Sequence, residues 1–443
     1  MEQLRSGATA AVGVRVVEDG RQGFASAGSL DDDVVAETLA AARDNLRFGE
    51  VDPDQKIAEP DGVASPGLDL SDDAVLAVPE SEKIATAIEL ERRCRGADAR
   101  ITGVRVSAWS DSWGESALVS TAGIDIAERG GSCSIGCQPL AVDGDETQIG
   151  YGGDAARRPD QLDVDAVVAE AVADATGQLG AAKPASARLT VVLDPDVTAA
   201  FLGIVAGSLT GDRVLKGRSP FADRVGEQIA ATSLTLHDDP TDPTTLGATN
   251  FDDEGLAGRV NVLVDAGVLT GFLHNCYTAR RSGTRSTGSA VGGGGASPGV
   301  GMHAMVMSPG GAGGNGHDGQ LDRAGRAGRA TPARAGRATS ARAGRADESV
   351  EQLLPSVGDG VLVRGVHGLH SGVNPVSGDF SVGAHGNHIR AGELAEPFRE
   401  ATVAGTLQRM LLDVVAVSAR PKRLPGGMKM YAIAIGDVAL SGS

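Results

Sequence analysis

The stretch "ARLTVVLDPDVTAAFLGIVAGSLTGD", Ala187 to Asp212, predicts a buried β-strand that runs directly into an α-helix. Asp194 is placed to cap the start of that helix, and Pro195 suits its first turn, where the missing N–H removes no hydrogen bond. Just upstream, "VDAVVAEAVADATGQLGA" (164–181) predicts another helix, because its apolar residues recur on one face. These layers of sheet and helix indicate an α+β fold.

The first 185 residues are expected to form an N-terminal sheet-and-helix domain. The stretch "AVGVRVVEDGRQGFASAG" (11–28) alternates apolar residues about the turn Glu18-Asp19-Gly20 and predicts a β-hairpin. Helices are expected within 29–46 and 81–96. Between residues 101 and 142 the apolar period changes to two, and Gly, Ser and Asp divide the segment into four runs, which predicts an antiparallel meander of short strands.

After a strand-helix segment at 186–232, residues 233–443 are expected to form a mostly antiparallel β domain. The stretch "REATVAGTLQRMLLDVVAVSA" (399–419) is expected to supply one late helix. An insertion at about 310–347 contains "RAGRAGRATPARAGRATSARAGRA", with seven arginines and no aromatic residue. Because it has too little apolar area to offset chain entropy, we expect it to be disordered and solvated.

Charge and composition argue against some classes of binding partner. The net charge of −18 over 443 residues argues against nucleic acid or an anionic membrane surface. No apolar run approaches the roughly 18 residues that span a bilayer, and the N-terminus lacks the basic-then-apolar plan of a secretion signal, so we expect a cytoplasmic protein. Cys133 and Cys137 are four apart, which on a strand places both on one face as buried thiols.

Four histidines lie in "HGLHSGVNPVSGDFSVGAHGNH" (367–388): His367, His370, His385 and His388. Each pair is three residues apart, which on a strand points the two side chains to opposite faces and spoils chelation. A hairpin about "NPVSGD" would instead let His370 and His385 face each other. We favour ordinary strand and loop histidines, with a metal site at these four residues as the alternative.

The segment "NPVSGDFS" (374–381) predicts a tight loop, because Asn-Pro and Ser-Gly-Asp are turn sequences. Asp379 is placed to cap the turn by accepting backbone N–H bonds. If the loop has a function beyond connection, the candidate peptide-binding residues are His370, Asn374, Ser377, Gly378, Asp379 and Phe380.

The chain resembles the TldD/PmbA family. "GLHSGVNPVSGDFSVGA", "VVLDPDVTAAFLGIVAGSLTGDRVLKGRSPFADRVGE", "DDPTDP", "FDDEG" and "GVLTGFLHNCYTARRSGTRSTGSA" carry the resemblance. It implies the fold of that family. In the family, TldD-type subunits are zinc metallopeptidases with a His-Glu-x-x-x-His helix and a later cysteine ligand, whereas PmbA-type (TldE) subunits lack the motif. Family members usually begin with an additional helix and strand. We therefore expect this chain to begin after them and to lack part of the first layer.

The helix that corresponds to the zinc-binding one, Val197 to Gly211, holds no histidine and no glutamate, and the last cysteine is Cys276. None of the eight histidines is followed by glutamate, and no phosphate-binding loop of the form Gly-x₄-Gly-Lys-Ser/Thr occurs. Without two imidazoles and a carboxylate base, a helix cannot hold Zn²⁺ and activate its water. The resemblance therefore implies a non-catalytic subunit with no cofactor of its own.

Such a subunit is expected to pair with a TldD-like partner that carries the zinc, and the complex to act on extended or unfolded peptides or to mature modified peptides. Exposed strand edges and Gly-rich loops suit peptide backbone pairing, and a homodimer is a further possible assembly. Two alternatives stay open: a metallopeptidase in its own right that uses the histidine cluster, and a stand-alone adaptor or regulator of the gyrase-modulator kind.

Overall fold

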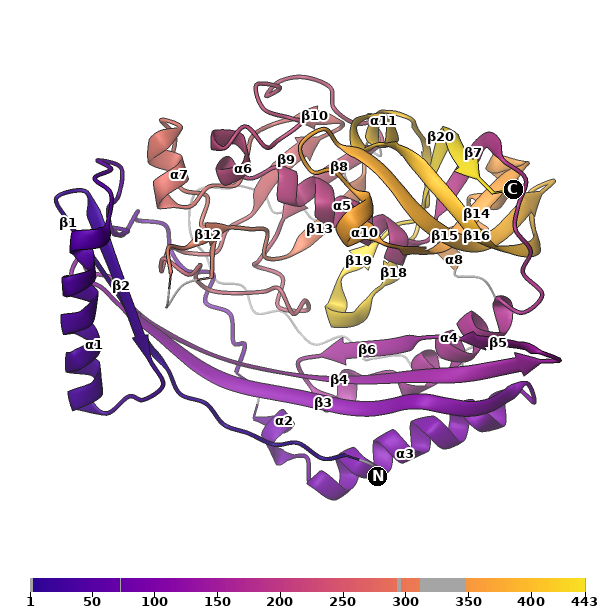
Figure 1. The fold of residues 1–443 in the computed structure, drawn as a ribbon, viewed down its shortest axis with the longest axis horizontal. Helices are drawn as coiled ribbons and strands as arrows, with labels where there is room; N and C mark the ends of the chain where they lie inside the picture. The colour runs from indigo at the N-terminus through magenta and orange to yellow at the C-terminus, as the bar shows by residue number, and fades with distance from the viewer. Residues whose placement is uncertain (1–2, 72, 293–295, 311–347, 443) are drawn as a thin grey trace, which may run out of the picture.

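The computed structural model describes residues 3–71, 73–292, 296–310 and 348–442. The insertion predicted at about 310–347 lies outside the described residues except at its first residue. The described chain is a mixed α+β protein, as expected, with an N-terminal hairpin, a central sheet and a C-terminal β-rich domain (Figure 1).

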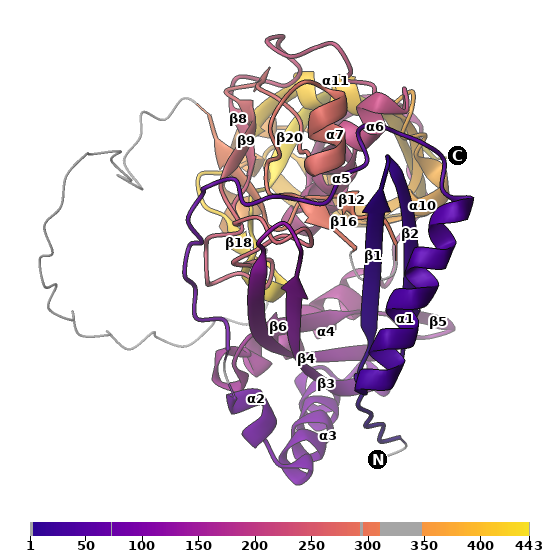
Figure 2. The same cartoon turned by 90° about the vertical axis from the view of Figure 1, so that its left-hand side faces the viewer.

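The predicted N-terminal hairpin is confirmed. Strands β1 (Val12–Glu18) and β2 (Arg21–Ala27) pair antiparallel about a turn in which Asp19 and Gly20 both have positive φ. Helix α1 (Asp32–Asn45) packs against the hairpin and continues into the short 3₁₀ turn η1 (Leu46–Phe48). Gly23 permits this close packing, because a Cβ there would lie 2.1 Å from a backbone oxygen of α1. Figure 1 shows this unit upright at one end of the molecule, and in Figure 2 the same unit faces the viewer.

The central sheet differs from the predicted meander of short strands. Residues 101–142 form two long strands, β3 (Ile101–Val119) and β4 (Asp125–Asp143), each of 19 residues. The glycines that appeared to divide the segment lie inside the ladder, where Gly114 pairs with Gly130. The short strands β5 (Glu146–Ile149) and β6 (Gly152–Ala156) pair with β4.

Helices α3 (Glu80–Ala97) and α4 (Val164–Gly177) cover one face of this sheet, near the short α2 (Ala74–Ala77) and η2 (Pro159–Gln161). Cys133 and Cys137 lie on one face of β4 and are both buried, as predicted. In Figure 1, α3 lies on one side of the long ribbon and the C-terminal domain on the other.

The C-terminal domain is built on a closed barrel. Its sheet has the order β16-β15-β14-β7-β20-β17, and a further pairing of β16 with β20 closes it. The strands are β7 (Ala187–Leu193), β14 (Gly360–His367), β15 (Asp379–Arg390), β16 (Glu393–Thr406), β17 (Val414–Val417) and β20 (Ile433–Ser441). The pairs are antiparallel except for β7 with β14, so the expectation of a mostly antiparallel domain is confirmed.

The prediction of a late helix within 399–419 is correct in kind but wrong in length. Residues up to Thr406 continue strand β16, the helix α11 (Leu407–Leu412) has six residues, and β17 follows it. The β-branched residues Thr402 and Val403 pair with both β15 and β20, and these ladders outweigh the local helical pattern.

Helix α5 (Pro195–Ser208) packs between the barrel and a second sheet of order β10-β9-β8-β13. That sheet comprises β8 (Leu234–Asp238), β9 (Asn261–Asp265), β10 (Val268–Leu269) and β13 (Met305–Pro309). The remaining elements are α6 (Gly211–Leu215), α7 (Cys276–Arg281), β11 (Ala290–Val291), β12 (Gly299–Val300), α8 (Glu348–Glu351), α9 (Leu354–Val357), α10 (Leu369–Gly372), β18 (Lys422–Arg423), η3 (Pro425–Gly427) and β19 (Lys429–Met430).

Polar contacts tie the central sheet to the C-terminal domain. Asn250 bonds to Glu128 of β4 through its backbone N–H and side-chain amide, at 2.8 and 2.9 Å, and to both backbone groups of Leu68. Lys422 of β18 reaches Glu170 of α4 at 2.6 Å. No helix in the described ranges is long and apolar enough to cross a membrane.

Candidate functional site

The loop predicted at "NPVSGDFS" connects α10 to β15 and is held by its own hydrogen bonds. The side-chain oxygen of Asn374 accepts the backbone N–H groups of Val376 and Ser377, at 3.0 and 3.3 Å. The Ser377 hydroxyl donates to the carboxylate of Asp379 at 2.6 Å. The capping role that we expected of Asp379 therefore belongs to Asn374, which begins the turn and whose amide oxygen accepts the N–H groups two and three residues later.

Helix α11 anchors the same loop. The carbonyl of Gly378 accepts the Leu407 N–H at 2.8 Å, and the Gln408 amide donates to the carbonyl of Ser377 at 2.9 Å. Gly378 has φ +83, and a Cβ there would lie 2.3 Å from the Gln408 side chain. Only glycine meets both requirements without strain, so this is a fixed turn.

The alternative pairing of His370 with His385 does not form. His367 and His385 come together, with Nε2 of one 3.1 Å from Nδ1 of the other and their rings stacked at 5.1 Å. His370 does not face His385, because residues 369–372 form helix α10 and leave the ladder. His388 packs its ring 5.6 Å from that of Phe398. Burial lowers the pKa of His385.

Metal binding by the four histidines needs at least three ligands around one point. Within the part of the chain that the structure describes, which includes all four, no three His, Cys, Asp or Glu side chains are grouped in that way. The geometry therefore gives the histidine cluster one close pair and no third ligand.

Among the other predicted site residues, His370, Asn374, Ser377 and Asp379 are exposed, whereas Gly378 and Phe380 are buried. Phe380 points away from solvent and packs edge-to-face on Phe201 of α5, with ring centroids 5.0 Å apart. The loop is thus connected through Phe380 to helix α5 and to a cavity beside it.

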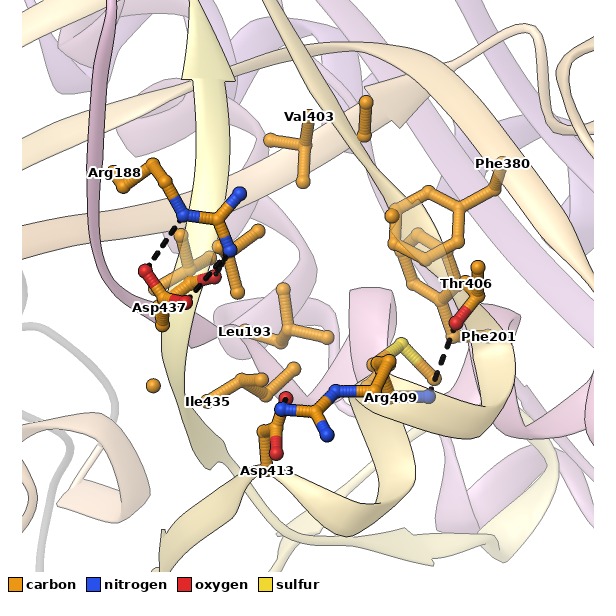
Figure 3. Close-up of a pocket in the computed structure, with 16 residues that line it drawn as sticks. Arg188, Leu193, Phe201, Phe380, Val403, Thr406, Arg409, Asp413, Ile435 and Asp437 are labelled. Atoms are coloured by element: carbon orange, nitrogen blue, oxygen red, sulfur yellow. Dashed lines mark hydrogen bonds and ion pairs between the residues drawn. The ribbon is translucent and has the colours of Figure 1, made fainter.

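This cavity has a volume of about 190 Å³ and lies among β7, β15, β16, β20 and α11 (Figure 3). Its apolar lining includes Val191, Leu193, Phe201, Phe380, Val403, Met410, Ile435 and Val438. Two ion pairs also border it. Arg188 binds Asp437 through two contacts of 2.7 and 2.8 Å, and Arg409 binds Asp413 at 2.9 Å.

Sequence reasoning missed this cavity. Its wall residues come from six separate elements, β7, α5, β15, β16, α11 and β20, and most have the residue types of ordinary strand and helix core. The spacing of Arg409 on α11 and Asp413 just after it, four residues apart, was the one local signal, and such pairs are common on exposed helices.

Helix α5 begins as predicted, with the side chain of Asp194 accepting the Asp196 N–H at 3.3 Å. Its buried face includes Val197, Phe201 and Leu202, whereas the exposed positions Gly203 and Gly207 carry no side chain. Neither face offers an imidazole or a carboxylate base at the middle of the helix.

Charged groups gather at the start of α5. Burial raises the pKa of Asp194 to about 6, although the nearby Lys422 opposes the shift. Lys422 binds Asp196 at 2.7 Å and Glu170 at 2.6 Å. Burial alone would lower the pKa of Lys422, but the surrounding carboxylates outweigh it and raise that pKa. This cluster fixes the helix against α4 and has the character of a structural ion-pair network.

Cys276, the last cysteine in the chain, is also poorly suited to bind zinc. It is buried, and its backbone N–H donates to the carboxylate of Glu254 at 2.7 Å. Burial and the adjacent negative charge both raise the pKa of its thiol, which keeps it protonated. A metal-binding cysteine needs the opposite environment.

Comparison with known proteins places three domain profiles of one family along the chain. The PmbA/TldA metallopeptidase domain 1 matches residues 1–46, the central domain matches 73–179, and the C-terminal domain matches 186–442.

Individual relatives agree with these profiles. The metalloprotease PmbA of Escherichia coli O157:H7 is 26% identical over 420 residues, which cover 94% of this chain and 82% of the relative. The PmbA homolog of Haemophilus influenzae is 24% identical and covers 92% and 80%. The crystal structure of TldE from Thermococcus kodakarensis has the same fold, with a TM-score of 0.79 at 22% identity over 98% of this chain and 94% of that one.

Proposed function

The chain belongs to the PmbA/TldA metallopeptidase family, and from this premise we propose that it is the PmbA-type (TldE-type), non-catalytic subunit of a zinc metallopeptidase complex. Its partner is a TldD-like chain that supplies the His-Glu-x-x-x-His helix and the zinc. One observation carries the proposal: α5 exposes Gly203 and Gly207 and holds neither an imidazole nor a carboxylate base on its central turns. Zinc-dependent peptide hydrolysis needs imidazole ligands for the metal and a carboxylate base for the attacking water.

We infer that this subunit contributes a surface for extended peptide. Strand β3 is an edge of the central sheet and, within the described residues, pairs with β4 alone. Residues 110–117 of this strand are exposed, so a long row of backbone groups is free to pair with a peptide irrespective of its side chains.

A groove on the same strand supports this inference. It has a volume of about 260 Å³ and lies on the face of the sheet, where it is lined by Val106, Ala108 and Ser110 of β3, by residues of β4 and β6, and by Tyr151 and Pro425. It lies between the central sheet and the C-terminal domain, where a bound peptide is enclosed from two sides. We also place the assembly in the cytoplasm, in keeping with four buried cysteines that are all free thiols.

The test is reconstitution with a TldD-like homologue from the same genome. The two chains are purified separately and together, and hydrolysis of an unfolded peptide is followed in each sample. We expect a stable complex and activity with both chains, and loss of activity when the partner's motif histidines are replaced by alanine. A chain that forms no complex with any such homologue indicates the stand-alone adaptor instead.

A further inference from the structure

The cavity beside Phe380 is large enough for a ligand. Apolar cavities of about 150 Å³ in proteins stay dry and bind benzene, and this one measures about 190 Å³. Its interior is formed by aliphatic and aromatic side chains that are mostly buried, such as Leu193, Phe201 and Val403. A phenyl or branched alkyl group therefore fits its size and polarity.

The border of the cavity is polar and balanced in charge. Arg188 with Asp437, and Arg409 with Asp413, place two guanidinium groups and two carboxylates beside an apolar interior (Figure 3). The side chains of Arg188 and Arg409 are 62% and 69% exposed, so each can exchange its partner without a large desolvation cost. Arginine is also the side chain that binds a carboxylate with two parallel hydrogen bonds.

Strand β20 has an irregular backbone at this border. The register of β20 against β7 shifts between Ile435 and Val438, which leaves Gly436 and Asp437 as a bulge. Asp437 has φ +54, a conformation that costs energy in a residue other than glycine. Bulges and strained residues of this kind are concentrated where a side chain is aimed at a site. Here the bulge aims the carboxylate that holds Arg188.

We propose that this cavity binds the apolar side chain of an α-amino acid whose free α-carboxylate pairs with Arg409 or Arg188. Two sources have this chemistry: a free apolar amino acid and the C-terminal residue of a peptide. A free amino acid also carries an ammonium group that can meet Asp413 or Asp437. The inference rests on the cavity alone and does not depend on the proposed subunit role.

Titration calorimetry of the full chain tests the proposal with L-phenylalanine, N-acetyl-L-phenylalanine, L-phenylalanine amide and L-serine. We expect saturable binding of at least one of the two acids, at least tenfold weaker binding of the amide, and none of serine. Preference for the free amino acid identifies that source, and preference for the acetylated form identifies a peptide C-terminus. Equal affinity for acid and amide, or no binding of either acid, overturns the proposal.

Variants locate the binding. Val438→Phe fills the cavity and should abolish binding, whereas Val262→Phe, at an exposed position of β9 in the second sheet, should not change it. Of Arg409→Gln and Arg188→Gln, the one that removes the guanidinium holding the carboxylate should weaken binding of the acid at least tenfold, and the matched control is Arg420→Gln, an equally exposed arginine in a distant ion pair. Circular dichroism confirms folding of each variant. Unchanged binding in Val438→Phe, or in both Arg409→Gln and Arg188→Gln, refutes the assignment.

Discussion

Replacing Lys422 by methionine should destabilise the protein in a pH-dependent way. Lys422 is the cation between Glu170, Asp196 and the buried Asp194, and its side chain is 23% exposed. Methionine keeps much of the side-chain volume but removes the charge. Removing one partner of a fully buried ion pair costs about 3–5 kcal/mol. Because Glu170 and Asp196 are 40% and 48% exposed, we expect about 2 kcal/mol at pH 7.5.

The pH dependence comes from Asp194. Its pKa is about 6 in the folded protein against 3.8 for an ordinary aspartate, so between about pH 4 and 6 the folded state holds a proton that the unfolded state has released. Stability therefore falls as pH rises through that window. Without Lys422, the pKa of Asp194 rises further and the loss continues to higher pH. At pH 5, where Asp194 is already largely protonated, we expect the variant to lose less than about 1 kcal/mol.

Denaturant unfolding of the wild type and Lys422→Met at pH 5 and pH 7.5 measures these differences. The matched control is Lys216→Met, which breaks the exposed pair with Asp212 on α6 and should cost less than about 0.5 kcal/mol at both pH values. If Lys422→Met loses the same stability at pH 5 as at pH 7.5, the assignment of the pH dependence to Asp194 is wrong.

Three further substitutions test the fold by denaturant unfolding. Gly378→Ala should cost about 1–2 kcal/mol, because alanine is strained at φ +83 and its Cβ meets Gln408; an unchanged midpoint would contradict the fixed turn. Phe201→Ala should cost about 3–5 kcal/mol by leaving a cavity in the barrel core, and a loss below 1 kcal/mol would mean that the ring is not packed there. Asn250→Ala should cost about 2 kcal/mol, since it removes the side-chain bonds to Glu128 and to both backbone groups of Leu68, and a neutral result would contradict this domain contact.

Local sequence signals were sufficient where one short segment determines the geometry. The hairpin about Asp19 and Gly20 follows from turn chemistry, and the cap at Asp194 follows from the need of helix N-terminal N–H groups for an acceptor. The burial of Cys133 and Cys137 on one face follows from the two-residue period of a strand. Each of these features depends on residues within a few positions of each other.

Features that depend on distant pairing were not predictable in the same way. The glycines at 114 and 130 suggested strand ends, but they lie opposite each other and let the β3–β4 ladder continue. The closure of the barrel by β16 on β20 joins Thr402 to Ser441, and no local pattern indicates it. That closure turns the expected late helix into strand and also creates the cavity walls. The alternative pairing of His370 with His385 does not form for a related reason, since one turn of helix removes His370 from the ladder.

The zinc content of the isolated chain tests the central claim most directly. The protein is purified without a partner, dialysed against trace zinc, and analysed for metal per chain together with peptidase activity. Our account predicts far less than one zinc per chain and no chelator-sensitive hydrolysis of peptides. One zinc per chain, lost together with activity in His367→Ala or His385→Ala, would contradict it and make the histidine pair part of an active site.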